Sequence, residues 1–272
     1  MKKNYRHFDP SSLCAVLFFA VLFVFSAKVA PAQDTVNSPL VTTTGPNVLG
    51  KGELQWNTQM EYYHLQHFWD APYGHTTTHG IGLEGNLRWG IGHKAELMFD
   101  LNSVTNYGKQ YDSSAMRNYG TLFTPSVGVR LELFEGRGWL PQVTFGTEVS
   151  LRKLSGYDFW FVQPTVGLQF RNRLGRHWLL DYSLGYGWNP MTSYFMEYGN
   201  PNFRYSLFAR WLPTDRLMLG LGVENGADVL EARWQATPDL QLSLQGNLQV
   251  GYGWLEGTFS GDVRVGLHWM LK

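Results

Sequence analysis

Hydrophobic and polar residues alternate with a two-residue period over most of residues 52–271. In residues 142–151, one set of alternate positions is apolar and reads Val143, Phe145, Thr147, Val149 and Leu151. The other set is polar or small and reads Gln142, Thr144, Gly146, Glu148 and Ser150. Because successive side chains of a β-strand point to opposite faces, this segment predicts a strand with one apolar and one polar face. Residues 178–188 repeat the pattern with larger aromatic side chains.

The polar face of these strands cannot form a conventional core, because it would bury glycines, amides and charges. The aromatic face must therefore be covered, and lipid around a closed barrel with a polar lumen is the simplest cover. The alternative is a soluble sandwich or lipocalin-like barrel with the apolar face inward. Tryptophans of the apolar face gather near strand ends, as in the aromatic girdles of membrane barrels. They are Trp89, Trp178, Trp188, Trp211, Trp234 and Trp269.

Alternation and turn residues together predict an all-β fold, a transmembrane antiparallel β-barrel of about 12 strands. The expected strands are 52–64, 77–90, 94–103, 119–134, 139–152, 159–171, 177–189, 202–212, 217–224, 229–236, 240–250 and 258–271. Short connections at 90–93, 135–138, 172–176, 213–216 and 237–239 are typical of periplasmic turns. Longer ones at 64–76, 103–118, 190–201 and 251–257 are typical of extracellular loops, with Asn225-Gly226 as a tight exception.

The N-terminus predicts export. Basic residues precede an apolar run at 13–25, which is too short to span a membrane as a helix, and Ala30-Pro31-Ala32 supplies a cleavage site. We therefore expect a cleaved signal peptide at 1–32, a periplasmic or lumen segment at 33–51 and an outer-membrane barrel at 52–272. This would place the protein in the outer membrane of a Gram-negative cell. The one cysteine, Cys14, would be removed, so no disulfide or cysteine-bound metal is expected in the mature chain.

Composition narrows the expected partners. The predicted mature chain carries a small acidic excess, which does not suit a nucleic-acid-binding protein. The expected partners are outer-membrane lipid, lipopolysaccharide, a small-molecule permeant and the barrel-assembly machinery, which would read the apolar stripe of the last strand. That stripe is Val263, Val265, Leu267, Trp269 and Leu271. No cofactor is expected.

Several short motifs resemble one family. They are the Gly45-Pro46-Asn47-Val48-Leu49-Gly50-Lys51-Gly52-Glu53-Leu54-Gln55 stretch, Leu87-Arg88-Trp89-Gly90-Ile91, Ala95-Glu96-Leu97, Gln163-Pro164-Thr165-Val166-Gly167 and Asp181-Tyr182-Ser183-Leu184-Gly185-Tyr186. Together they resemble the outer-membrane transporters of the meta-pathway phenol-degradation family, in its Bacteroidetes-type members. The resemblance implies an outer-membrane barrel that passes small compounds, including hydrophobic or aromatic ones.

Basic residues recur in the polar phase at the end of each even-numbered strand, usually followed by a bulky residue. They are Arg88, Arg130, Arg171, Arg210, Arg233 and His268. One interpretation is a basic collar at the periplasmic mouth that favours anions. The other is that these arginines pair with lumen carboxylates and fill the lumen. The other charged candidates are Glu53, Glu84, Glu96, Glu132, Glu148, Asp181, Glu224, Asp262 and Arg264.

Four histidines lie in or beside the first long connection, namely His64, His67, His75 and His79. Their spacing is compatible with an imidazole metal site, although a polar loop that is rich in histidine is the simpler interpretation. They are weak metal candidates.

The leading functional hypothesis is a passive channel or transporter for small molecules, with lumen charges setting selectivity. A structural or partner-binding barrel without transport is one alternative. A barrel enzyme, such as a lipid hydrolase or protease, is the other. No Gly-x-Ser-x-Gly motif occurs, and no convincing pair of serine and histidine lies in the lipid-facing phase, so we expect no catalytic residues. The sequence leaves open whether the lumen is plugged by residues 33–51 or blocked by paired side chains.

Overall fold

The computed structural model describes residues 45–69, 75–109, 117–137, 139–153, 160–187, 203–252 and 256–271. They form twelve strands and no helix, so no helix in these ranges could span a membrane. The strands are β1 (Leu54–Trp69), β2 (His75–Gly90), β3 (Ala95–Lys109), β4 (Arg117–Phe134), β5 (Gln142–Lys153), β6 (Trp160–Leu174), β7 (Trp178–Gly187), β8 (Phe203–Thr214), β9 (Leu217–Glu224), β10 (Ala227–Thr237), β11 (Leu240–Tyr252) and β12 (Glu256–Leu271). The predicted signal peptide lies outside the described residues.

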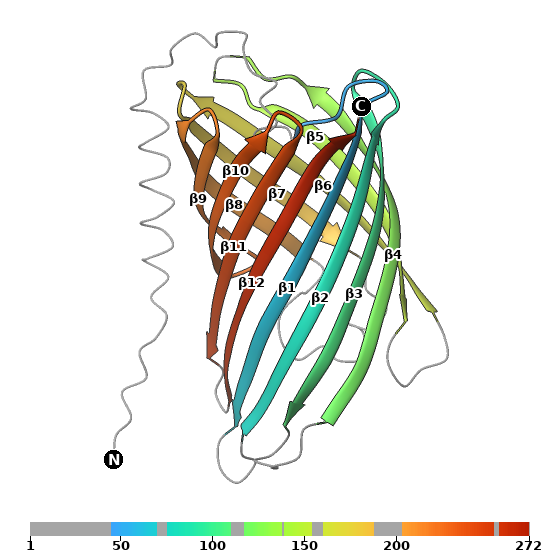
Figure 1. The fold of residues 1–272 in the computed structure, drawn as a ribbon, viewed down its shortest axis with the longest axis vertical. Helices are drawn as coiled ribbons and strands as arrows, with labels where there is room; N and C mark the ends of the chain where they lie inside the picture. The colour runs from blue at the N-terminus through green and yellow to red at the C-terminus, as the bar shows by residue number, and fades with distance from the viewer. Residues whose placement is uncertain are drawn as a thin grey trace.

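Each strand pairs antiparallel with the next, and β12 pairs with β1 to close the barrel. In the β1–β12 pairing that closes the barrel, Leu54 lies opposite Leu271 at one end and Trp69 lies opposite Glu256 at the other. The short connections and the end of β12 lie together at the top of Figure 1, and we call this the short-turn end. The opposite end is the long-loop end. The predicted fold class is therefore confirmed, including the number of strands.

The two faces of the wall are inverted relative to a soluble protein. Large apolar side chains, such as Met60, Leu83, Leu221, Leu230 and Leu244, are exposed on the outside. The buried side chains include many polar and charged ones, and these belong to the opposite phase of the same strands. Leu179, Leu212 and Met218 form a small buried apolar cluster inside. The wall therefore shows lipid-facing apolar residues around a polar lumen, as the alternation predicts.

The strands at the long-loop end extend further than predicted. β1 continues to Trp69 and β2 starts at His75, so most of the predicted loop 64–76 is paired strand. β3 likewise continues to Lys109, inside the predicted loop 103–118. The apolar phase is needed only where lipid covers the wall, whereas backbone pairing can continue beyond it. Hydrophobic alternation therefore underestimates strand length at this end.

The wall is not equally tall all the way round. β1 to β4 contain 15 to 18 residues each, whereas β9 contains 8. β9 and β10 are joined by the predicted tight turn, in which Asn225 and Gly226 have φ values of 50° and 86°. Two successive residues with positive φ are the requirement of a type I′ hairpin turn. The backbone of Asn225 donates to Tyr205 O, and its side chain accepts from Tyr205 N, which ties the turn to β8.

Candidate functional site

Charged side chains form a buried layer across the lumen near the short-turn end. We call it the charge layer and define it as Arg88, Glu96, Arg130, Arg171, Asp181, Arg210, Glu231 and Arg233. These residues come from β2, β3, β4, β6, β7, β8 and β10. Each lies in the phase opposite to the exposed apolar residues of its strand, so the period of two directs all of them inward.

Glu96 is the centre of one half of the layer. Its carboxylate is completely buried, with 0% exposure, and accepts from two arginines. Arg88 donates through Nη2 to Oε2 at 2.8 Å and through Nε to Oε1 at 3.0 Å. Arg130 donates through Nη1 to Oε1 at 3.1 Å. A buried carboxylate between two guanidinium groups is satisfied on both oxygens, which the burial of these charges requires.

Asp181 and Glu231 organise the other half. Arg171 donates to Asp181 through Nε and Nη2, each at 2.6 Å, in a bidentate geometry. Arg210 bridges the two acids by donating to Asp181 and to Glu231, and its guanidinium also lies over the ring of Phe208, 4.6 Å from the centroid. Arg233 is less well held, because its Nη2 is 3.6 Å from Glu231 Oε2. The layer contains five arginines and three acids.

The start of the described chain lies against this layer. Arg88 Nη2 donates to Asn47 O at 2.7 Å, and Arg130 Nη2 donates to Gly45 O at 2.5 Å. The backbone N–H of Leu49 donates to Glu96 Oε2 at 2.8 Å. Thr144 Oγ donates to Pro46 O. Backbone groups and charged side chains therefore fill the lumen together at this depth.

Gly45 shows how closely the segment fits. A Cβ atom at this position would lie 2.6 Å from Arg171 Nη2 and 2.7 Å from Asp181 Oδ2, and the φ of Gly45 is 69°. Only glycine accepts both the contact and the backbone angle.

At the short-turn edge, Gly52 N donates to Gly90 O at 2.7 Å and Gly90 N donates to Glu53 O at 2.9 Å. We call residues 45–49 the inserted segment.

His268 lies beside the charge layer with neutral partners. Its Nδ1 is 2.9 Å from Asn57 Oδ1, and its Nε2 is 3.0 Å from Ser243 Oγ. His268 was predicted as part of the basic series, and it does lie among those residues, because it interacts electrostatically with Arg88 and Arg233. Both the neutral and the protonated imidazole can form these two hydrogen bonds.

A second group of charges faces the lumen farther toward the long-loop end. We call it the acidic vestibule and define it as Glu61, Glu84, Asp100, Glu148, Glu224 and Asp262, together with Arg204 and Arg264. Arg264 pairs with Glu61 at 3.2 Å and with Asp262 at 3.1 Å. Glu84 interacts electrostatically with three acids, Asp100, Glu61 and Glu148, and also with Arg264. Acids outnumber bases in the vestibule, the reverse of the charge layer.

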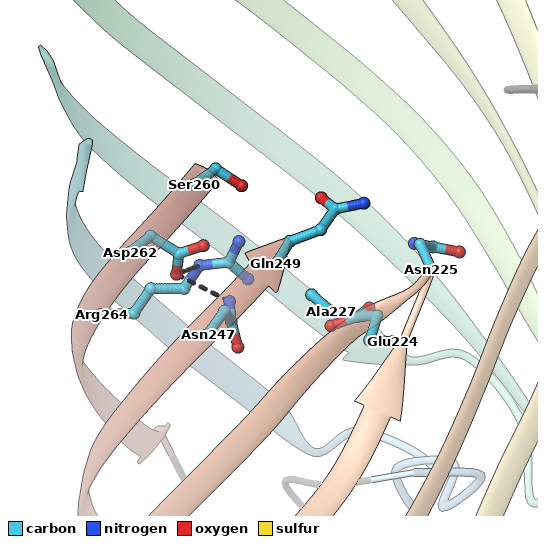
Figure 2. Close-up of a pocket in the computed structure, with 8 residues that line it drawn as sticks. All are labelled: Glu224, Asn225, Ala227, Asn247, Gln249, Ser260, Asp262 and Arg264. Carbon is cyan, nitrogen blue, oxygen red and sulfur yellow. Dashed lines mark hydrogen bonds and ion pairs between the residues drawn. The ribbon is translucent and has the colours of Figure 1, made fainter. Parts of the chain in front are cut away.

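Two cavities open in the vestibule. One has a volume of about 240 Å³ and is lined by polar side chains, including Glu224, Asn247, Gln249, Ser260 and Asp262 (Figure 2). Figure 2 also shows Arg264 pointing toward Asp262 and Asn247, across the cavity from Glu224. The other cavity, of about 380 Å³, extends from Asp100 and Glu148 to Arg204 and reaches Arg130 of the charge layer. The vestibule therefore has room for a small molecule.

The predicted site residues separate into these two groups. Arg88, Arg130, Arg171 and Arg210 pair with Glu96, Asp181 and Glu231, as the lumen-filling interpretation expected of the arginines. Glu84, Glu148, Glu224, Asp262 and Arg264 lie in the vestibule. Of the predicted carboxylate partners, Glu96 and Asp181 join these arginines. Outside the vestibule, Glu53 instead accepts from Gly50 N at 2.7 Å, and Glu132 accepts from Gln142 at 2.8 Å.

Sequence reasoning missed Glu231, Glu61, Asp100 and Arg204. A lumen location was one of two expected for residues 33–51, but the contacts of the inserted segment were not predicted. The sequence does indicate the position of Glu231, because this residue lies two positions before Arg233 and therefore on the same face of β10. Glu61 shares the lumen phase of β1 with Gln55 in the same way. Residues 45–49 show no periodic pattern from which their contacts could be predicted.

Two of the four candidate histidines meet on the outer face. His64 and His79 are directly paired across β1 and β2, with Nδ1 atoms 3.4 Å apart, and Tyr62 Oη lies 2.8 Å from His79 Nδ1. The predicted loop location is wrong for His67 and His75, which lie in strands. The side chains of His67 and His75 lie outside the described residues. Among described side chains, no group of three or more histidines, cysteines or acids is placed to hold a metal ion.

Comparisons with known proteins identify the fold. No family model matches the sequence, and a search of curated proteins gives no match. An outer-membrane channel from Pseudomonas putida F1 is similar in structure, with 12% identity and a TM-score of 0.53, over 88% of this chain and 100% of that one. A ΔS2S3 mutant of the monoaromatic hydrocarbon channel TodX, a P. putida protein, is similar with 7% identity and a TM-score of 0.50, over 89% and 96% of the chains. The chain therefore has the fold of outer-membrane β-barrels.

Proposed function

We propose that the protein is an outer-membrane channel or transporter for small molecules, with its short-turn end in the periplasm. The observation that carries the proposal is a polar lumen inside a lipid-facing wall, open in the vestibule and closed by one inserted segment. A purely structural barrel has no need of cavities of 240 and 380 Å³ that lead to a removable closure. The similar channel structures support the fold that this function requires.

Passage through the barrel requires the inserted segment to move. Glu96 and Thr144 are buried at the depth where the segment crosses. The segment is held by hydrogen bonds with Arg88, Arg130, Thr144 and Glu96. Because each such bond contributes only about 0.5–3 kcal/mol net, the closed form can exchange with an open one.

The vestibule favours cationic or neutral polar permeants over anions. Among the described side chains, six acids and two arginines define it, with Arg130 of the charge layer lining one of its cavities, and Arg264 is already shared by Glu61 and Asp262. The resemblance to the meta-pathway phenol-degradation family would make small aromatic compounds the permeants. A phenol-like molecule suits both observations, because it has a polar group for the vestibule amides and a ring small enough for the 240 Å³ cavity.

Planar-bilayer recording tests the proposal directly. The parent protein should show small, rarely open conductance, and a variant that lacks residues 33–49 but keeps the signal peptide should conduct continuously. Swelling of liposomes in a phenol or small-polyol gradient should rise in the same order. If the deletion variant folds to a barrel and conducts no more than the parent, a channel function is wrong.

Ion selectivity tests the role of the vestibule in the same deletion background. The double variant Glu84→Gln/Glu148→Gln should reduce cation preference, as measured by the reversal potential in a salt gradient. The preference should also fade near 1 M salt, where the screening length is about 3 Å. Glu135→Gln, on an exposed turn, is the control and should leave the reversal potential unchanged.

A further inference from the structure

One arginine of the charge layer is incompletely satisfied. Arg233 Nε and Nη1 are buried and have no hydrogen-bond partner among the described residues. Its Nη2 reaches only to 3.6 Å from Glu231 Oε2, and that acid already accepts from Arg210. A buried guanidinium ordinarily has its donors paired, because the desolvation of an unpaired charge is costly. Arg233 therefore presents donors to something other than the side chains around it.

A second unsatisfied donor lies on the same side of the lumen. Gln55 has 0% exposure, its Oε1 accepts from Arg88 Nη1 at 2.8 Å, and its Nε2 has no partner among the described residues. Because Oε1 is fixed by Arg88, the amide cannot be turned to offer an acceptor instead. The orphaned atoms of Arg233 and Gln55 are thus all donors. One acceptor nearby, Gln235 Oε1, two positions from Arg233 on the same face of β10, is also buried without a partner among the described residues.

The surroundings are short of negative charge. His268 lies between the two residues in strand order, on β12, and interacts electrostatically with both Arg88 and Arg233. The neighbouring lumen residues are Gln235 on β10, Gln241 and Ser243 on β11, and Asn57 on β1, none of them acidic. Glu96 and Glu231 are the acids nearest in the layer, and both are shared by two arginines. The charge layer as a whole contains five arginines and three acids, so it carries a net positive charge.

We propose that the lumen binds a small oxyanion, of the phosphate or carboxylate class, between Arg233 and Gln55 beside His268. Oxyanions carry several acceptor lone pairs and bind arginine with strong charge-assisted hydrogen bonds, so one such ion can satisfy donors from two strands. His268 lines the site, but its two nitrogens are engaged with Asn57 and Ser243 and are not available to the ion. The site does not depend on the proposed channel function.

Thermal unfolding of the intact barrel in detergent tests the site with inorganic phosphate and acetate as probes. Sodium phosphate and sodium acetate are each compared with sodium chloride at equal ionic strength, and circular dichroism follows the strands. A ligand that binds only the folded state raises Tm, by about 5–10 °C at one hundred times its Kd. We expect such a rise with at least one of the two probes, and the larger rise identifies the preferred class.

Two variants and a matched control locate the effect. Arg233→Gln should abolish the rise, whereas Arg216→Gln, an exposed arginine on the turn before β9, should retain it. Gln55→Glu should also abolish it, because the new carboxylate would occupy the site, and this variant carries the test if Arg233→Gln fails to fold. No rise beyond chloride in the parent, or an equal rise in parent and Arg233→Gln, would overturn the proposal.

Discussion

The lumen holds charged side chains at two levels, and the surroundings of the charges differ between them. In the charge layer, Glu96, Asp181 and Glu231 are buried, and each contacts two arginines. In the acidic vestibule, Arg264 pairs with Glu61 and Asp262, whereas Glu84 interacts electrostatically with three acids as well as with Arg264. Open cavities lie beside Asp100, Glu148, Glu224 and Asp262. Both levels use the same phase of the strands. Alternation therefore decides that a charge faces the lumen, whereas depth decides whether it must be paired.

The difference follows from water. A carboxylate beside a water-filled cavity can remain solvated, so acids can gather there at moderate cost. A carboxylate in a filled layer has lost its water and needs a guanidinium within hydrogen-bond distance. The charge layer is therefore suited to sealing the barrel around the inserted segment, and the vestibule to receiving a solute. The following predictions test that division.

The largest effect should come from removing one acid of the charge layer. Glu96→Gln leaves Arg88 and Arg130 without their shared counter-charge and should lower the free energy of unfolding by about 3–5 kcal/mol. Urea denaturation of the barrel in lipid vesicles measures the loss.

Glu84→Gln is the matched change in the vestibule. It removes a charge that faces other acids, so stability should stay the same or rise. Equal losses from the two glutamine substitutions would show that the two levels do not differ in pairing.

The next largest effect should appear when arginine is placed on the lipid face and on the lumen face of one strand at the same depth. Leu244 is 53% exposed on the outside of β11, and Gln245 is the next residue and faces the lumen. Leu244→Arg should cost about 2–4 kcal/mol because it places a charge in the bilayer. Gln245→Arg should fold better than Leu244→Arg, since it points into the polar lumen, between Glu231 on β10 and Arg264 on β12. Folding yield in vesicles, measured by the electrophoretic shift of the barrel, compares them, and similar yields would contradict the assignment of faces.

A smaller effect should come from loosening the inserted segment. Thr144→Val removes the hydroxyl that donates to Pro46 O and should cost about 1–3 kcal/mol, because the carbonyl is left buried without that donor. The open fraction in single-channel records should increase. Thr147→Val is the control on the same strand, because its hydroxyl donates to Thr165 O in the wall and does not touch the segment. Equal channel noise in both variants would argue against a gating role for residues 45–49.

The sequence predicted the wall of the barrel well. All twelve strands and their faces follow from alternation, because lipid requires an apolar residue at every second position. The predicted strand ends were less accurate beyond the lipid-covered part of the wall, where an apolar residue at every second position is not required. At the long-loop end, β1 and β3 continue to Trp69 and Lys109 through residues whose pairing needs no apolar phase.

The contents of the lumen were only partly predictable. That Arg88 and Glu96 face inward follows from phase, but which acid each arginine finds depends on the stagger of the strands around the closed barrel. Thr144 and Pro46 are 98 residues apart and meet only because β5 and the inserted segment reach the same depth. No local pattern encodes such a contact, and the same is true of Gly45 against Arg171.

The smallest effect should come from an ion pair outside the lumen. Lys94 and Glu135 lie 2.9 Å apart on two turns of the short-turn end, with side chains 53% and 71% exposed. The hydrogen bond to Glu135 raises the pKa of Lys94, so the pair is intact at neutral pH. Exposed pairs contribute little, because water and salt screen them. Lys94→Ala should therefore leave the urea midpoint unchanged within error, although its distance resembles that of Arg88 to Glu96. A loss comparable to that of Glu96→Gln would mean that distance alone, and not burial, determines what these ion pairs contribute.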